Sequence, residues 1–234
     1  MQAKLFLGCI VSLALLVPSI LRADEYDDLL KSADKAILER DFDLGIAHCN
    51  RAIAIDRKFP SAYITRAWAY SGKEDYDKCI EDCSTALALR PDAYHQSWAY
   101  RNRAGAYSDK RQYEQAIKDY QKAIQIQPKS TSGYAGLAWL LATCPVDKFR
   151  DGKKAFEYAN KAYVLDPRDA NNLENLAAAY AECGDFDQAV SWQEKALQGA
   201  LEGRDKAADA DDSSIEDFRG RLDLYKKKMP YRTK

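Results

Sequence analysis

The chain is built on an internal repeat, which limits its fold more than any other feature. Alanines recur in one series with steps of 34, 37, 34 and 39 residues, and a second series runs beside it. The first series is Ala33, Ala67, Ala104, Ala138 and Ala177, and the second is Ala52, Ala86, Ala123, Ala162 and Ala196. A period of this length is typical of a solenoid, in which each unit buries its apolar face only against its neighbours. Alanine allows two helices to cross closely, so the pattern predicts helix pairs.

Aromatic residues precede most of the second helices, and prolines close three of the units. The aromatic residues are Phe42, Tyr76, Tyr113 and Phe186, and the prolines are Pro91, Pro128 and Pro167. The fullest copies read "AYITRAWAYSGKEDYDKCIEDCSTALALRP" and "AYRNRAGAYSDKRQYEQAIKDYQKAIQIQP". These copies resemble the tetratricopeptide repeat (TPR), a two-helix unit. The resemblance covers about Tyr26–Gly203. It implies an all-α fold, a right-handed TPR α-solenoid of about five helix-turn-helix repeats.

The repeat register predicts the domain organisation. The five repeats are expected at about 26–59, 60–93, 97–130, 131–169 and 170–203, within a solenoid over 24–203. A polar connector over 204–212 precedes "SSIEDFRGRLDLYKKKM", which we interpret as a capping helix and tail over 213–234. Apolar residues recur there at helical spacing, at Ile215, Phe218, Leu222, Tyr225 and Met229. A membrane-surface helix is a weaker interpretation because the charges are mixed rather than mainly basic.

Residues 1–23 have the sequence pattern of a secretory signal peptide. A basic start and the apolar run Leu5–Leu21 are followed by the acidic sequence "DEYDD", with cleavage expected after Ala23. The mature protein is therefore expected in the periplasm or outside the cell, with no stable membrane span, or tethered to the membrane if the segment stays uncleaved. Cleavage removes Lys4 and Arg22, so the formal net charge changes from −1 to −3. That balance argues against nucleic acid as a partner.

Neither a catalytic site nor a cofactor site can be assembled from the sequence. The two histidines, His48 and His95, accompany no nucleophile motif, and no glycine-rich phosphate loop is present. We therefore expect a protein that is not an enzyme and holds no cofactor or metal.

Cysteines offer a third, weaker interpretation, a thiol redox or metal-binding protein. The mature chain has five, at Cys49, Cys79, Cys83, Cys144 and Cys183, an odd number without paired spacing. Cys79 and Cys83 share a helical face, and His48 and Cys49 lie one repeat earlier. In register, however, Cys79 aligns with Ala116 and Cys83 with Tyr120, which are packing positions.

An insertion distinguishes the fourth repeat. The two alanine series are 19 residues apart in the other four repeats and 24 apart here, so five extra residues lie within "TCPVDKFRDGKKA". We predict an extended turn in which Pro145 ends the first helix, Asp151 caps the second, and Phe149 fills the wedge between helices. Cys144 and Cys183 hold equivalent turn positions, but adjacent repeats are about 10 Å apart, too far for an easy disulfide. The segment also resembles a variant repeat, "AWLLATCP…DGKKA", of bacterial exported TPR proteins.

The TPR resemblance implies a concave groove, lined by first-helix residues, that binds a protein or peptide. Carried over by register, the groove residues here are Trp68, Trp98, Arg101, Asn102, Trp139, Asn171 and Asn175. The family's carboxylate clamp is not reproduced, because Leu30 and Asp34 hold its positions in the first repeat. An alternative for each tryptophan is that it merely packs between helices.

Two functions remain in competition. The leading hypothesis is an exported, non-enzymatic scaffold that binds a protein partner in a tryptophan-lined groove. The alternative is a structural subunit of a cell-envelope assembly, which makes its contacts through the convex face or the C-terminal helix.

Overall fold

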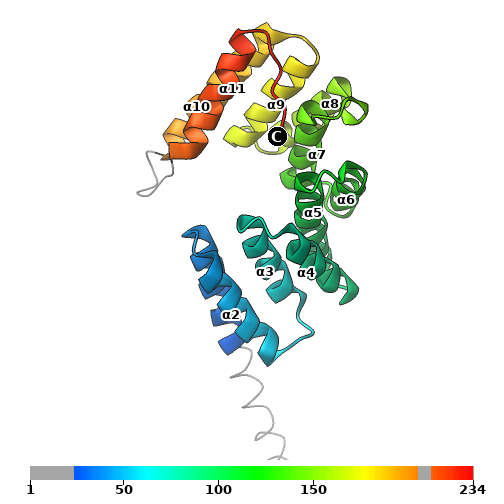
Figure 1. Ribbon diagram of the computed structural model, residues 1–234, viewed down its shortest axis with the longest axis vertical. Helices are drawn as coiled ribbons and strands as arrows, with labels where there is room; N and C mark the ends of the chain where they lie inside the picture. The colour runs from blue at the N-terminus through cyan, green and yellow to red at the C-terminus, as the bar shows by residue number, and fades with distance from the viewer. Residues whose placement is uncertain (1–23, 205–211, 234) are drawn as a thin grey trace, which may run out of the picture. The chain divides into compact units, whose positions relative to one another are not determined.

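The computed structural model describes residues 24–204 and 212–233, and these form helices joined by turns, with no strand among them (Figure 1). The helices follow one another in consecutive pairs, so the prediction of an all-helical repeat fold is confirmed. The predicted signal peptide and most of the predicted connector lie outside the described residues.

Each repeat contributes a first and a second helix. The first helices are residues 24–38, α3 (Pro60–Gly72), α5 (Ala93–Asp109), α7 (Thr131–Thr143) and α9 (Ala170–Glu182). The second helices are α2 (Phe42–Ile55), α4 (Tyr76–Ala88), α6 (Tyr113–Ile126), α8 (Gly152–Leu165) and α10 (Phe186–Arg204). The helix α11 (Asp212–Lys226) comes last. The chain forms two compact units, and the N-terminal unit ends at Ala106, within α5.

The turns inside the first two repeats share one construction. In the first two repeats, Arg40 and Glu74 adopt left-handed φ angles of 62° and 60°, which reverse the chain after the first helix. Asp41 and Asp75 follow, and each carboxylate accepts a hydrogen bond from a backbone N–H in the first turn of the next helix. A capping aspartate satisfies an amide that the helix itself leaves free.

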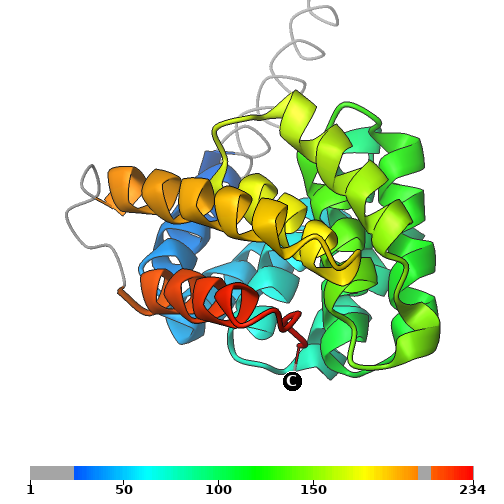
Figure 2. The ribbon, with the colours of Figure 1, turned by 90° about the horizontal axis from the view of Figure 1, so that it is seen from above.

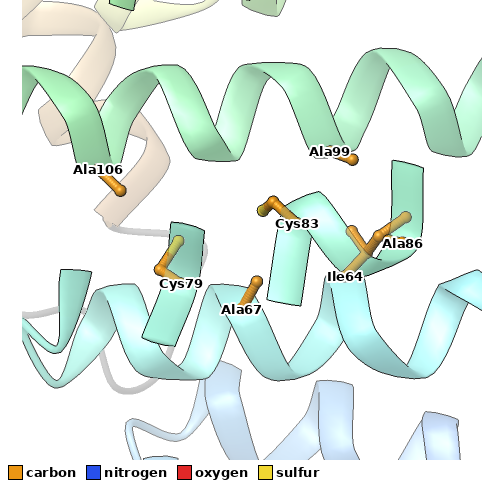
Figure 3. Packing of buried hydrophobic residues seen from close by; sticks show 7 residues of the cluster. All are labelled: Ile64, Ala67, Cys79, Cys83, Ala86, Ala99 and Ala106. Atoms are coloured by element: carbon orange, nitrogen blue, oxygen red, sulfur yellow. The ribbon is translucent and has the colours of Figure 1, made fainter. Parts of the chain in front are cut away.

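Small residues form the core of the N-terminal unit. Figure 3 shows alanines and cysteines of α3, α4 and α5 in the space between these helices, with Ile64 beside Ala86 at one end of the cluster. All ten alanines of the two periodic series are buried, at 2% exposure or less. Cys79 and Cys83 belong to this cluster and are fully buried, as their register predicts.

An ion pair joins the two helices of the second repeat. The Arg66 guanidinium donates to both carboxylate oxygens of Asp82, at 2.8 Å from Nε and 2.7 Å from Nη2. Burial raises the pKa of Asp82, and the bonds from Arg66 oppose that shift.

In the C-terminal unit, α11 lies alongside α10 (Figures 1 and 2). The apolar side chains of α11 are buried there, at Ile215, Phe218, Leu222 and Tyr225. Met229, which the apolar stripe also included, lies beyond the helix and is exposed. The apolar face of α11 is therefore used inside the unit, which weakens the hypothesis that this helix contacts an assembly.

The insertion of the fourth repeat forms an extended turn between α7 and α8. Cys144 is extended, with ψ 131°, directly before Pro145, and a short 3₁₀ turn covers Asp147–Phe149. Asp151 caps α8 by accepting a 3.0 Å hydrogen bond from the Lys154 N–H. Phe149 packs against Tyr113, with ring centroids 5.3 Å apart. The predicted roles of Pro145 and Asp151 are confirmed, whereas the ring contact of Phe149 is with Tyr113 of the preceding repeat.

Candidate protein-binding surfaces

In the N-terminal unit, three aromatic side chains of first helices gather on one surface. The rings of Trp68 on α3 and Trp98 on α5 lie 6.5 Å apart between centroids, at an interplanar angle of 54°. Tyr94 lies one turn before Trp98, with centroids 6.1 Å apart, and is 59% exposed. We call these three residues the N-terminal aromatic surface. Both tryptophans are half-buried, and Trp98 also packs against the core cluster.

Two further predicted residues extend this surface along α5. Arg101 and Asn102 follow Trp98 at the helical spacings of three and four residues, which places them one turn farther along its side of the helix. Both are half-buried. The Asn102 carbonyl oxygen lies 3.9 Å from the Cys79 sulfur, while its side-chain Nδ2 is buried without a hydrogen-bond partner among the described residues. The structure thus places Trp68, Trp98, Arg101 and Asn102 within one unit.

In the C-terminal unit, the predicted groove residue Trp139 is covered by residues near the C-terminus of the chain. The Tyr231 ring packs on Trp139 with centroids 5.6 Å apart. The Arg221 guanidinium of α11 lies 5.5 Å from the Trp139 centroid and 5.4 Å from that of Tyr231. Trp139 occupies the same register position as Trp68, yet in this unit a segment of the chain itself already contacts that position.

The two predicted asparagines of α9 do not join Trp139 in a single open surface. Asn171 is exposed at the start of α9, where its side chain donates a 3.0 Å hydrogen bond to the capping Asp169. Asn175 is buried, at 5% exposure. The Asn171 side chain is therefore engaged with the capping Asp169, and the buried Asn175 amide is shielded from a partner.

The sequence analysis did not predict a buried polar network that lies in the C-terminal unit. Glu174 of α9 accepts from Arg221 Nε at 2.5 Å and from Gln193 Nε2 at 3.0 Å, and the same Gln193 nitrogen lies 3.1 Å from the Phe218 carbonyl oxygen. Burial raises the pKa of Glu174, and Arg221 opposes that shift. The single sequence signal was a glutamate at a first-helix position that holds Ile64 in another repeat.

Four of the five cysteines among the described residues lie in packing environments. Cys49, Cys79, Cys83 and Cys144 are buried and Cys183 is exposed, and all five are free thiols. Burial raises the pKa of Cys49 to about 12, so its thiol resists ionisation at neutral pH. Over residues 24–204 and 212–233, no group of three or more histidine, cysteine or acidic side chains is placed to hold a metal ion.

Comparison with known families agrees with this architecture. Three models described as the tetratricopeptide repeat match the sequence, over residues 60–93, 97–130 and 173–202. The chain is a tetratricopeptide-repeat protein. No curated protein matches it in sequence. In the described part of this TPR protein, no helix combines the length and apolar character needed to cross a membrane.

Several solved structures share the fold at low sequence identity. TTC0263, a thermophilic TPR protein of Thermus thermophilus, is 19% identical, with a TM-score of 0.68 over 86% of this chain and 99% of its own. PilF of Pseudomonas aeruginosa is 15% identical, with a TM-score of 0.63 over 87% and 90% of the two chains. YrrB, described as a TPR protein with an unusual peptide-binding site, is 17% identical, with a TM-score of 0.52 over 78% and 91%.

Proposed function

We propose that this TPR protein is an exported, non-enzymatic scaffold that binds a segment of another protein on the N-terminal aromatic surface. The contact between Trp68 and Trp98, with the exposed Tyr94 beside them, is the observation that carries the proposal. Tryptophan, tyrosine and arginine are the side chains most enriched at binding hot spots. Arg101 and Asn102 continue the same surface with polar groups.

The surface is also suited to binding because its rings are held in place before a partner arrives. Trp98 packs against the core and against both Trp68 and Tyr94, so little side-chain freedom remains to be lost on association. Asn102 Nδ2, which has no hydrogen-bond partner among residues 24–204 and 212–233, is a donor for a partner that reaches it, because a buried donor is costly to leave unsatisfied.

The family supports a protein partner in general terms. TPR proteins act through protein–protein contacts, and the related fold of YrrB is described as carrying a peptide-binding site. Export rests on the composition of residues 1–23 alone. The mass of the protein isolated from its own cells tests that part, because a mature chain that begins at Asp24 is expected.

Site-directed photocrosslinking in intact cells tests the binding surface. A photoreactive phenylalanine analogue at Tyr94 should give a defined crosslinked product, whereas the same analogue at Leu44, an exposed α2 residue of the same unit, should not. Trp98→Ala should then weaken the purified pair by about 2 kcal/mol, or roughly 30-fold in Kd. Equal crosslinking at both positions, or an unchanged affinity, would contradict the proposal.

A further inference from the structure

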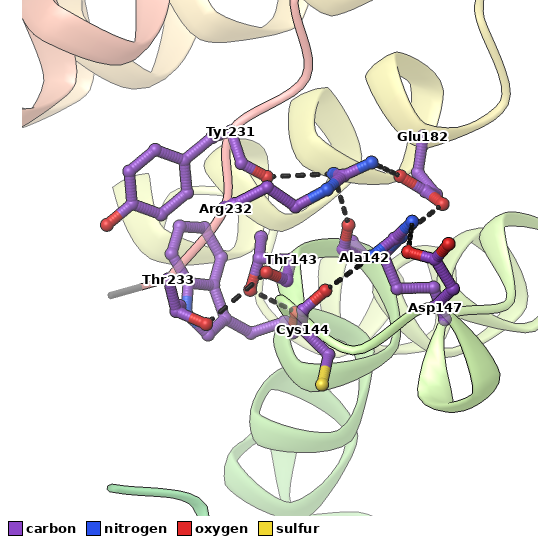
Figure 4. Close-up of polar contacts among 10 residues, drawn as sticks. Ala142, Thr143, Cys144, Asp147, Glu182, Tyr231, Arg232 and Thr233 are labelled. Atoms are coloured by element: carbon purple, nitrogen blue, oxygen red, sulfur yellow. Dashed lines mark hydrogen bonds and ion pairs between the residues drawn. The ribbon is translucent and has the colours of Figure 1, made fainter. Parts of the chain in front are cut away.

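The C-terminal unit holds the end of its own chain as an extended segment. After α11 ends at Lys226, Lys228 adopts a left-handed φ of 56° and the Met229 N–H donates to the Leu224 carbonyl. Residues 230–233 then run without helical structure back to the ends of α7 and α9. We call these four residues the C-terminal tail. All four are half-buried, and Figure 4 shows how Tyr231, Arg232 and Thr233 lie over these helix ends.

The tail uses carbonyl groups that α7 leaves free. The last carbonyls of a helix lack intrahelical partners, and here Pro145 prevents the helix from continuing. The inserted turn satisfies two of these carbonyls, since Asp151 N–H donates to Leu141 and Arg150 donates to Cys144. The tail satisfies the carbonyl of Thr143, the last residue of α7, through the Thr233 N–H at 3.0 Å.

Side chains add an aromatic contact and an ionic contact to this backbone bond. Tyr231 packs on Trp139 with the two rings tilted by 37°, and it is also contacted by Arg221. Arg232 Nη2 lies 2.6 Å from Glu182 Oε2, and the other oxygen of Glu182 accepts from Arg150 at 2.9 Å. The Glu182 side chain is only 14% exposed. An extended backbone, an aromatic anchor and an arginine on a shielded carboxylate together form the contact set of a bound peptide.

We propose that the C-terminal tail is a displaceable internal ligand, and that the surface beneath it accepts an extended partner segment in which an aromatic residue is followed directly by arginine. This inference rests on the proposed scaffold function and names a second surface and its ligand chemistry. It concerns the C-terminal unit alone, so its outcome is separate from that of the N-terminal aromatic surface.

A tethered ligand competes at an effective concentration of millimolar order. A free peptide therefore binds the wild-type protein weakly, and loosening the tail should strengthen that binding by on the order of tenfold. The probe is a fluorescein-labelled heptapeptide with the sequence KMPYRTK, the chain's own residues 228–234. Its anisotropy is measured with the full mature protein and with the full-length double variant Tyr231→Ala, Arg232→Ala.

The double variant should bind the probe at least about tenfold more tightly than the wild-type protein. Adding Glu182→Gln should abolish that gain, and a probe with glutamate in place of arginine should not bind the double variant. The glutamate probe needs no further change in the protein, so it tests the ionic contact even if Glu182→Gln disturbs folding. The matched control is the double variant with Trp68→Ala in place of Glu182→Gln. Probe binding by this control should equal that of the double variant.

Equal probe binding by the wild-type protein and the double variant overturns the inference, as does absence of binding to both, or equal binding of the glutamate probe. Crosslinking at Tyr94 with no gain of probe binding would leave the scaffold function standing and remove this second surface. Probe binding without crosslinking at Tyr94 would support the second surface and contradict the first.

Discussion

Arg66 and Asp82 show how much depends on one side chain in a repeat built from alanine. The Asp82 side chain is 6% exposed and depends on Arg66 for compensation of its charge. Arg66→Met should destabilise the protein by about 3 kcal/mol at pH 7, because it leaves a buried carboxylate unpaired. The double variant Arg66→Met, Asp82→Asn is the control and should recover part of that loss. Urea denaturation followed by circular dichroism measures both.

The same pair predicts a pH dependence. Burial raises the pKa of Asp82 in the folded protein above its ordinary value of 3.8. A raised acid pKa means that the contribution of Asp82 to stability decreases as the pH rises through the folded pKa. Arg66→Met raises that pKa further, so the penalty should be smaller at pH 4 than at pH 7. A penalty that is constant between these pH values would contradict this account.

Asp151 predicts the opposite pH dependence at the start of α8. The backbone N–H and the side chain of Lys154 lower the pKa of this carboxyl. Its contribution is present above pH 3.8 and is lost as the pH falls through the lower folded pKa. Asp151→Ala should cost about 1 kcal/mol at pH 7, whereas Asp151→Asn should cost little and remove the acid dependence. Urea midpoints at pH 7 and pH 3 distinguish the two variants.

At the scale of elements, α11 is held to the C-terminal unit mainly by apolar packing. Tyr225 is fully buried and its hydroxyl has no hydrogen-bond partner among the described residues. Tyr225→Phe should therefore leave the stability unchanged or raise it by up to about 1 kcal/mol. Tyr225→Ala should cost about 3–5 kcal/mol, because it leaves a cavity. Thermal unfolding of both variants is the measurement, and a loss in Tyr225→Phe would reveal a hidden polar contact.

The elements differ in how far the sequence predicts them. The helix pairs, the buried alanines and the inserted turn were predictable, because each depends on spacing within one repeat. The position of Tyr231 on Trp139 was not, because the tail has no repeat register and its partner lies far away in the sequence. The pair Glu174–Arg221 was missed for the same reason, since it forms only when α11 reaches α9.

For the whole molecule, thiol accessibility is a compact test of the packing. Of the five cysteines among the described residues, four are buried and Cys183 is exposed. One thiol per chain should react readily with Ellman's reagent under native conditions, and five should react in guanidinium chloride. Cys183→Ser is the control and should abolish the native reaction. Three thiols in denaturant would indicate a disulfide, with Cys144–Cys183 the first pair to examine by peptide mapping.

The contact between Tyr231 and Trp139 means that tryptophan fluorescence can report whether the C-terminal tail is in place. An indole in contact with a phenol ring and a guanidinium emits differently from one that faces water. With Trp68, Trp98 and Trp192 replaced by phenylalanine, the remaining indole would report release of the tail as a change in emission wavelength and lifetime. Binding at this surface could then be followed in real time without a label on the partner.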